Sequence, residues 1–151
     1  MNTNTKKITT ITLWVNRIVA AIVAVLIFTL PALLDWYGDR LGYKPYPEDM
    51  VGIAVCYDLC AVAMLIALWN VDKLLRNILA GSVFVPENVK RVRRVVWCCA
   101  AVALVCFAAT SFVLPMLIFA IIMSFLCMAI NVAACVLDAA VSIREENDLT
   151  I

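Results

Sequence analysis

Four long apolar stretches alternate with polar segments along the chain, and this alternation sets the predicted elements. The stretches cover about residues 13–34, 50–70, 95–114 and 116–140. Uncharged apolar runs of about 18 residues or more are typical of helices that span a bilayer. We therefore predict an all-α membrane protein, a single domain over residues 1–151, whose four transmembrane helices form two hairpins.

A proline separates the third stretch from the fourth. Residues 95–137 contain no charged side chain, and as one helix they would extend for about 65 Å, twice the hydrocarbon thickness. The chain must therefore turn back. Proline cannot join the hydrogen-bond ladder of a preceding helix, so Pro115 predicts a tight turn at this point.

The segment between the hairpins, residues 71–96, is charged but keeps a helical period. Apolar residues recur at i, i+3, i+4, i+7 and i+8 from Val71, with charged residues on the other face. This pattern predicts an amphipathic continuation of the second span. We expect Gly81 to help end that helix and Pro86 to start the next one.

Residues 35–49 are rich in glycine, proline and aromatic residues, which predicts a loop with rings at the headgroup level. Small residues in the spans predict close helix contacts and one compact four-helix bundle.

Composition supports a membrane location and charge indicates the orientation. Apolar residues make up 66% of the chain, charged residues 15%, and mean hydropathy is +1.01, which excludes an ordinary soluble domain. Ten basic residues fall on the side of the termini and only two on the other. The positive-inside rule then predicts cytoplasmic termini, an external loop at residues 35–49 and a cytoplasmic central segment. The basic cluster at residues 90–94 is expected to contact the anionic headgroups of the lipid bilayer, with no direct binding of nucleic acid.

Four polar residues in the spans stand out because burying such groups in lipid is costly. Arg17 and Asp138 lie at similar depth, which predicts an interhelical ion pair. Asn131 is a candidate for an interhelical hydrogen bond. Asp58 has two readings: a protonated or hydrogen-bonded structural residue, or a proton or ion site.

No pattern of residues points to catalysis. All seven cysteines lie within the predicted spans and the chain has no histidine, so we expect neither a disulfide framework nor a metal site. The sequence also contains no recognisable nucleophile–base pair or phosphate loop. We expect a non-enzymatic protein without a cofactor.

Two segments carry a resemblance to a known family. They are residues 74–96, with Phe84, Asn88 and the Val92–Arg93 pair, and the C-terminal run from Glu145 to the end of the chain. The chain resembles a bacterial family of small four-span membrane proteins catalogued as a domain of unknown function, which implies a location in the bacterial inner membrane. Genes of that family commonly neighbour one for a short Cro/C1-type helix-turn-helix regulator, so the resemblance implies a soluble partner.

These observations predict a membrane-anchored regulatory protein that binds a helix-turn-helix transcription regulator on its cytoplasmic face. The C-terminal tail and the central segment are expected to form one docking surface, with the apolar end of the tail buried in a groove. The residues expected to contact the partner are Arg76, Phe84, Asn88, Arg91, Arg93, Arg94, Glu145, Glu146, Asn147, Asp148, Leu149 and Ile151. The alternative is a small transporter, exporter subunit or immunity-type membrane protein in which Asp58 matters. Both functions are compatible with a homo-oligomer.

Overall fold

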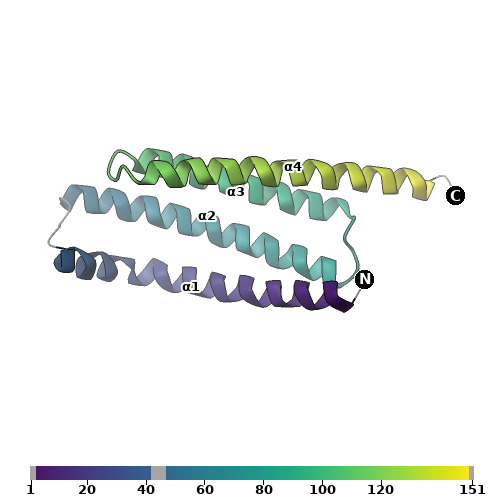
Figure 1. Ribbon diagram of the computed structural model, residues 1–151, viewed down its shortest axis with the longest axis horizontal. Helices are drawn as coiled ribbons and strands as arrows, with labels where there is room; N and C mark the ends of the chain where they lie inside the picture. The colour runs from purple at the N-terminus through teal and green to yellow at the C-terminus, as the bar shows by residue number, and fades with distance from the viewer. Residues whose placement is uncertain (1–2, 42–46, 150–151) are drawn as a thin grey trace.

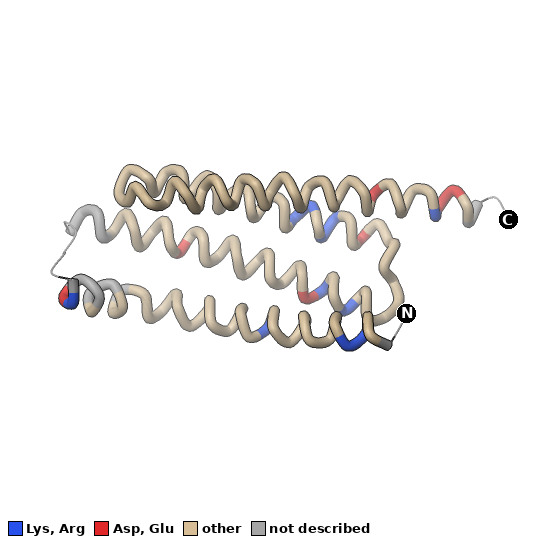
Figure 2. Tube along the Cα trace, viewed as in Figure 1, with Lys and Arg blue, Asp and Glu red and all other residues tan. Residues whose placement is uncertain are grey.

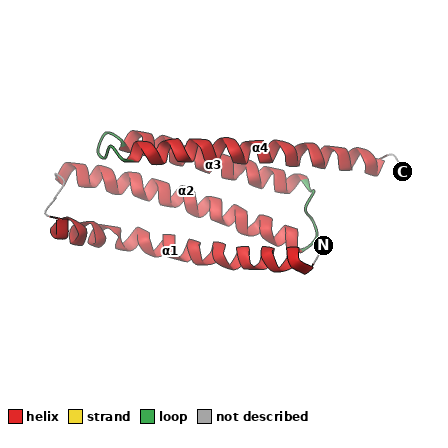
Figure 3. Ribbon diagram, viewed as in Figure 1, coloured by secondary structure: helices red, strands yellow, loops and turns green. Residues whose placement is uncertain are grey.

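The protein folds into four long helices joined by short connections (Figure 1). The computed structural model describes residues 3–41 and 47–149. The helices are α1 (Thr3–Leu41), α2 (Pro47–Leu79), α3 (Pro86–Ala109) and α4 (Met116–Leu149). Within these described residues there is no strand (Figure 3), so the predicted all-α class is confirmed.

All four helices are long and apolar enough to cross a bilayer. The apolar segments are Asn4–Leu30, Val51–Leu79, Pro86–Ala109 and Met116–Asn147. A helix needs about 20 apolar residues to cross the hydrocarbon core, and each segment exceeds that length. The chain is therefore a multi-pass membrane protein.

Successive helices run in opposite directions, so both chain termini and the α2–α3 connection lie at one end of the molecule (Figure 1). We call this end the basic end, because Figure 2 shows most lysines and arginines gathered toward it. Those in the described residues are Lys6, Lys7, Arg17, Lys73, Arg76, Lys90, Arg91, Arg93, Arg94 and Arg144. Arg40 lies toward the opposite end, near the last turn of α1.

The helices form an open layer rather than the predicted compact bundle. Among the described residues, α1 packs on α2, α2 on α3 and α3 on α4, while α1 and α4 do not meet. Short connections make chain neighbours pack side by side. Closing the layer into a bundle would bring little gain, because lipid chains solvate apolar side chains as well as other helices do.

Small residues form part of the contact between helices, although Ala21, Ala129 and Ala133, which we also expected at such contacts, are exposed. The most buried apolar residues include Ala61, Ala103, Ala120 and Ala134, none more than 9% exposed. Large apolar residues such as Phe28 point outward and are 85% exposed. This arrangement is the inverse of a soluble core and fits a lipid environment.

Two of the predicted turns differ from the structure. The loop expected at residues 35–49 is mostly helical, because α1 continues through Gly38 to Leu41 and α2 begins at Pro47. One glycine costs a helix only about 1 kcal/mol, and proline is well suited to a first helical position. Tyr43, Lys44, Pro45 and Tyr46, also assigned to that loop, lie outside the described residues.

The reversal before α4 is also longer than predicted. Helix α3 ends at Ala109, five residues before the expected end of the third span. Residues 110–115 then form a hydrogen-bonded turn, with the Phe112 N–H donating to Ala109 O at 3.0 Å. The Phe112 ring lies directly over Gly52 of α2, where a Cβ atom would come within 2.7 Å of it. The turn is thereby packed against the second helix as well as ending the third.

Candidate interaction surface at the basic end

The α2–α3 connection is held in place by a buried asparagine. Gly81 adopts φ +84° and the Ser82 N–H donates to Asn77 O at 2.9 Å, which is the Schellman ending expected for α2. Asn88, in the first turn of α3, has no exposed surface. Its Nδ2 donates to Ser82 O and Val83 O, both at 2.8 Å, and its Oδ1 accepts from Asn77 Nδ2 at 2.7 Å. One amide therefore ties the end of α2, the connection and the start of α3 together.

The connection holds Phe84 partly in the open. Its side chain is 45% exposed, while neighbouring Val89 is buried at 4%. Because Asn88 fixes the backbone on the N-terminal side of Phe84, the ring is carried by an ordered turn.

An ion-pair network joins α1 to α2 near the basic end. Asp72 accepts from Arg17 Nε at 2.9 Å and from Arg76 Nη2 at 2.6 Å. Its side chain is only 14% exposed, whereas the two arginines are 43% and 61% exposed. The Asp72 carboxylate is thus mostly buried, while both arginine side chains keep substantial exposed surface.

A second pair joins α3 to α4. Arg93 Nη2 donates to Asp138 Oδ2 at 2.7 Å, and both side chains are more than half exposed. On α3 itself, Arg91 pairs with Glu87 at 3.2 Å and is 14% exposed. Its Nε is buried without a hydrogen-bond partner in the described part of the chain.

The predicted pair between Arg17 and Asp138 is therefore wrong. Arg17 pairs with Asp72 and Asp138 pairs with Arg93. The physical reason is the open layer, in which α1 and α4 lie at opposite edges. Equal depth does not produce contact when two helices are not neighbours.

The C-terminal part of α4 extends past the start of α3 (Figure 1). The Arg93–Asp138 pair sets the register of these antiparallel helices, so α3 begins at about the level of Glu145. Residues 142–147 are all exposed. The helix continues to Leu149, and this end of the molecule combines an accessible acidic helix with the basic residues of α2 and α3.

The residues predicted to contact a partner divide into two groups. Asn88 is fully buried, Arg91 is mostly buried and Arg93 is engaged with Asp138. These three have structural contacts within the chain. The other described residues, Arg76, Phe84, Arg94, Glu145, Glu146 and Asn147, are exposed, although Arg76 also pairs with Asp72, and Glu146 and Asn147 have interactions of their own. The side chains of Asp148 and Leu149, and all of Ile151, lie outside the described residues, so the expected burial of the tail's apolar end stays a prediction.

Trp14 and Trp69 lie near the basic end, and Trp36 lies toward the other end. The Arg17 guanidinium lies 5.8 Å from the Trp14 ring centre, and Lys73 Nζ lies 5.0 Å from that of Trp69. At the opposite end, Arg40 lies 5.5 Å from Trp36. Along α1, Trp14 and Trp36 are about 33 Å apart at about 1.5 Å per residue, close to the thickness of the hydrocarbon core. The rings therefore mark the two boundaries at which aromatic residues collect.

Asp58 and Asn131 lie within the apolar spans, and both are exposed on the outside of their helices. Neither forms a hydrogen bond or ion pair with any residue the structure describes. The predicted interhelical hydrogen bond of Asn131 is thus not made to any described residue of the chain. Asn16 of α1, by contrast, is buried and forms an interhelical hydrogen bond. Its Nδ2 donates to Leu68 O of α2 at 3.0 Å.

Two apolar grooves lie along the layer. One, of about 500 Å³, lies over α2 and is lined by residues of all four helices, including Val23, Tyr57, Met64 and Cys99. The other, of about 730 Å³, lies between α3 and α4. The thiols of Cys60 and Cys106 meet between α2 and α3. Within the described residues, no three cysteine or carboxylate side chains form a group that could hold a metal ion.

Sequence reasoning missed two residues of this surface, Asp72 and Asn77. Asp72 lies on the helix that forms a hairpin with α1. Arg17 and Asp72 are nearly the same number of residues from the hairpin connection, so their contact could have been predicted. Asn77 could have been found as an amide facing Asn88 across a six-residue connection.

Residues 36–151 match the family DUF2975, described as a protein of unknown function. Neither the curated proteins nor the solved structures contain a match to the chain. The matched part begins near the end of α1 and includes all of α2, α3 and α4.

Proposed function

Since the chain belongs to the DUF2975 family, whose function is unknown, we propose that it is a non-enzymatic membrane anchor for a soluble regulator. The proposed partner is a helix-turn-helix transcription regulator, bound at the basic end. The observation that carries this proposal is the end of α4, an exposed helix with two adjacent acids, Glu145 and Glu146. It is accessible to a soluble protein, whereas the spans are accessible mainly to lipid.

The distribution of charges supports one orientation of the protein in the membrane. Ten basic residues lie toward the basic end, against Arg40 in the described residues at the other. Basic residues accumulate on the cytoplasmic side of membrane proteins. The basic end thus faces the cytoplasm of a bacterial cell, where a transcription regulator would meet it.

The exposed residues suit a protein partner in two ways. Phe84 is an aromatic side chain on an ordered turn, and aromatic anchors often dominate the binding energy of an interface. Glu145 and Glu146 complement a basic surface, and a helix-turn-helix protein has one where it contacts DNA phosphates. Acids bound there would compete with DNA. The gene neighbourhood implied by the family resemblance supports the same partner.

Binding of the purified regulator to vesicles containing the protein tests this proposal. The probe is the helix-turn-helix protein encoded beside the gene. Reversing the charges in Glu145→Lys/Glu146→Lys, or truncating Phe84→Ala, should weaken binding about tenfold or more. Phe28→Ala is the matched control, because Phe28 is an exposed phenylalanine on the lipid-facing side of α1.

Deleting residues 145–151 gives the complementary test. The deletion removes only the part of α4 beyond the start of α3, so the four spans should remain folded. The regulator should then move from the membrane fraction to the soluble fraction. Retention of the regulator at the level of the full chain would contradict docking at this helix.

A transport function remains the second proposal, because Asp58 is a carboxylate exposed on the span of α2 without a partner in the described residues. An unpaired acid in a membrane span often belongs to a proton or ion pathway. If Asp58 has only a structural role, Asp58→Asn should not change the behaviour of the protein in reconstituted vesicles. Loss of a proton-coupled flux on this substitution would favour a transporter, exporter subunit or immunity-type protein.

A further inference from the structure

A stripe of three polar residues runs along α4, and one of them has no hydrogen-bond partner among the described residues. Ser124, Asn131 and Asp138 are spaced by seven residues and therefore lie along one side of the helix. Asp138 pairs with Arg93, and the Ser124 hydroxyl donates to Ala120 O at 2.8 Å. Asn131 has no partner among the described residues. It lies seven residues deeper than Asp138, about 10 Å further into the apolar span.

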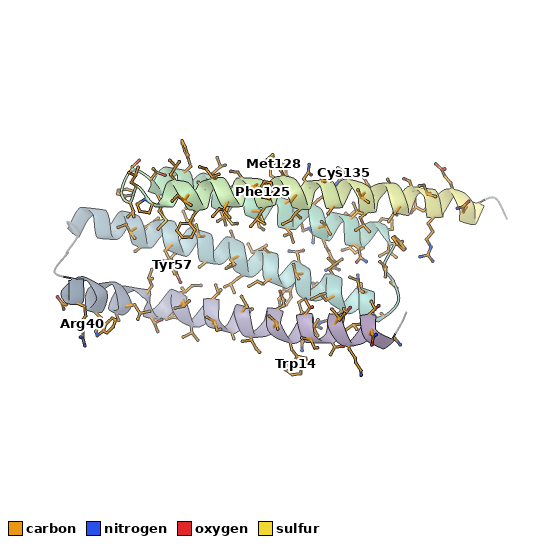
Figure 4. The ribbon with its side chains drawn as sticks, in the orientation of Figure 1. Trp14, Arg40, Tyr57, Phe125, Met128 and Cys135 are labelled. Carbon is orange, nitrogen blue, oxygen red and sulfur yellow. The ribbon has the colours of Figure 1, made fainter. Side chains whose placement is uncertain are left out.

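An amide in hydrocarbon needs a hydrogen-bond partner, since an unpaired one costs several kcal/mol relative to water. The nearest neighbours of Asn131 on this side of α4 do not supply one. Met128 and Cys135 precede and follow it by one turn; both are exposed, and both are labelled in Figure 4. The partner group must therefore come from another molecule.

An apolar groove begins one turn from Asn131. The groove between α3 and α4, about 730 Å³, is lined by Ser124 of the polar stripe, by Met128, and by Ala100 and Leu104 of α3. Small residues such as Ala100 and Ser124 allow two helix backbones to approach closely in a membrane.

We infer that this side of α4 binds a second copy of the chain, with Asn131 of each copy hydrogen-bonded to Asn131 of the other. The amide is self-complementary, because its NH₂ donates and its oxygen accepts. Two copies with the same topology hold this residue at the same depth. A two-fold axis along the membrane normal then pairs the two amides without any change in either chain.

The other edge of the layer provides a comparison. The outer face of α1 exposes Trp14, Ile18, Ile22, Val25 and Phe28, all of which lipid chains can solvate. In the described residues, the unpaired amide in the middle of an edge span belongs to α4, since Asn4 of α1 lies at the very start of its helix. The polar complementarity therefore selects α4, and the expected assembly is a closed dimer rather than an extended array.

Thiol cross-linking of the purified protein in lipid nanodiscs or vesicles tests the arrangement. Cys135 is the one exposed cysteine of the described chain and lies one turn from Asn131. With the other six cysteines replaced by alanine, oxidation by copper phenanthroline should link two Cys135 thiols into a covalent dimer. The matched control moves the thiol to the adjacent position, Cys135→Ala/Val136→Cys, which has nearly the same depth, lies about 100° around the helix and is also exposed.

Asn131→Leu should weaken self-association about 3- to 30-fold, and Asn131→Gln should retain much of it, because glutamine keeps the amide. Circular dichroism should show the same helix content for all variants, since Asn131 makes no hydrogen bond to the described residues of its own chain. Equal cross-linking at Cys135 and at the Val136→Cys position would overturn the inference. So would an unchanged dimer fraction in Asn131→Leu, or a protein that stays monomeric in lipid and cross-links only to a different membrane protein.

Discussion

Asn88 is the single side chain on which the basic end depends most. Replacing it with alanine would leave Asn77 Nδ2 and the carbonyls of Ser82 and Val83 without their partner. Each unpaired buried group costs about 1–3 kcal/mol, so Asn88→Ala should lower the free energy of unfolding by at least that amount. Thermal unfolding in detergent measures the loss. Lys90→Ala, two residues away and exposed, is the control and should change stability by less than about 0.5 kcal/mol.

The Arg17–Asp72 pair also acts at the scale of single residues. A double-mutant cycle with Arg17→Ala and Asp72→Ala should give a coupling energy of about 1 kcal/mol, reduced by the partial exposure of Arg17. Asp72→Ala should cost more than Arg17→Ala, because Asp72 also holds Arg76. The free energies of thermal unfolding of the variants in detergent provide the measurement. Arg17→Ala and Asp138→Ala should be additive, and coupling between them would contradict the open layer.

Contacts between elements depend on Gly52 and Phe112, which join α2 to the α3–α4 turn. Any Cβ at position 52 would lie 2.7 Å from the Phe112 ring, so Gly52→Val should displace the ring and destabilise the protein by about 1–3 kcal/mol. In a Phe112→Ala background the same change should cost less than about 0.5 kcal/mol. Unfolding of the four variants gives the comparison. Equal costs in both backgrounds would mean that the ring is not held over Gly52.

Sequence patterns predicted the ends of the helices better than they predicted which side chains contact one another. Proline at position 86 and glycine at position 81 act through local backbone geometry, so the start of α3 and the end of α2 could be found without a structure. The partner of Arg17 could not be found by depth alone, because depth says nothing about which helices lie side by side. The family resemblance led to the prediction that Asn88 contacts a partner protein. Its burial depends on the path of the α2–α3 connection, which hydropathy does not encode.

The whole molecule is expected to have one orientation in the membrane. In a variant without native cysteines, Ser82→Cys should react with a membrane-impermeant maleimide only after the cells are permeabilised. Asp39→Cys should react in intact cells, because it lies at the opposite end of the layer. The reverse labelling pattern would place the basic end outside the cell and would remove the basis for a cytoplasmic partner.

The order of helices in the layer also has a consequence for how the chain is made. Each helix contacts only the helix before it and the helix after it in the described structure. Contacts between chain neighbours close short loops, which costs little entropy and allows rapid folding. Each new span can therefore dock on the preceding one as it leaves the ribosome and enters the bilayer, without waiting for the C-terminus. Biogenesis of this protein should proceed from α1 to α4 in sequence, and chains interrupted after α2 should already hold the Arg17–Asp72 pair.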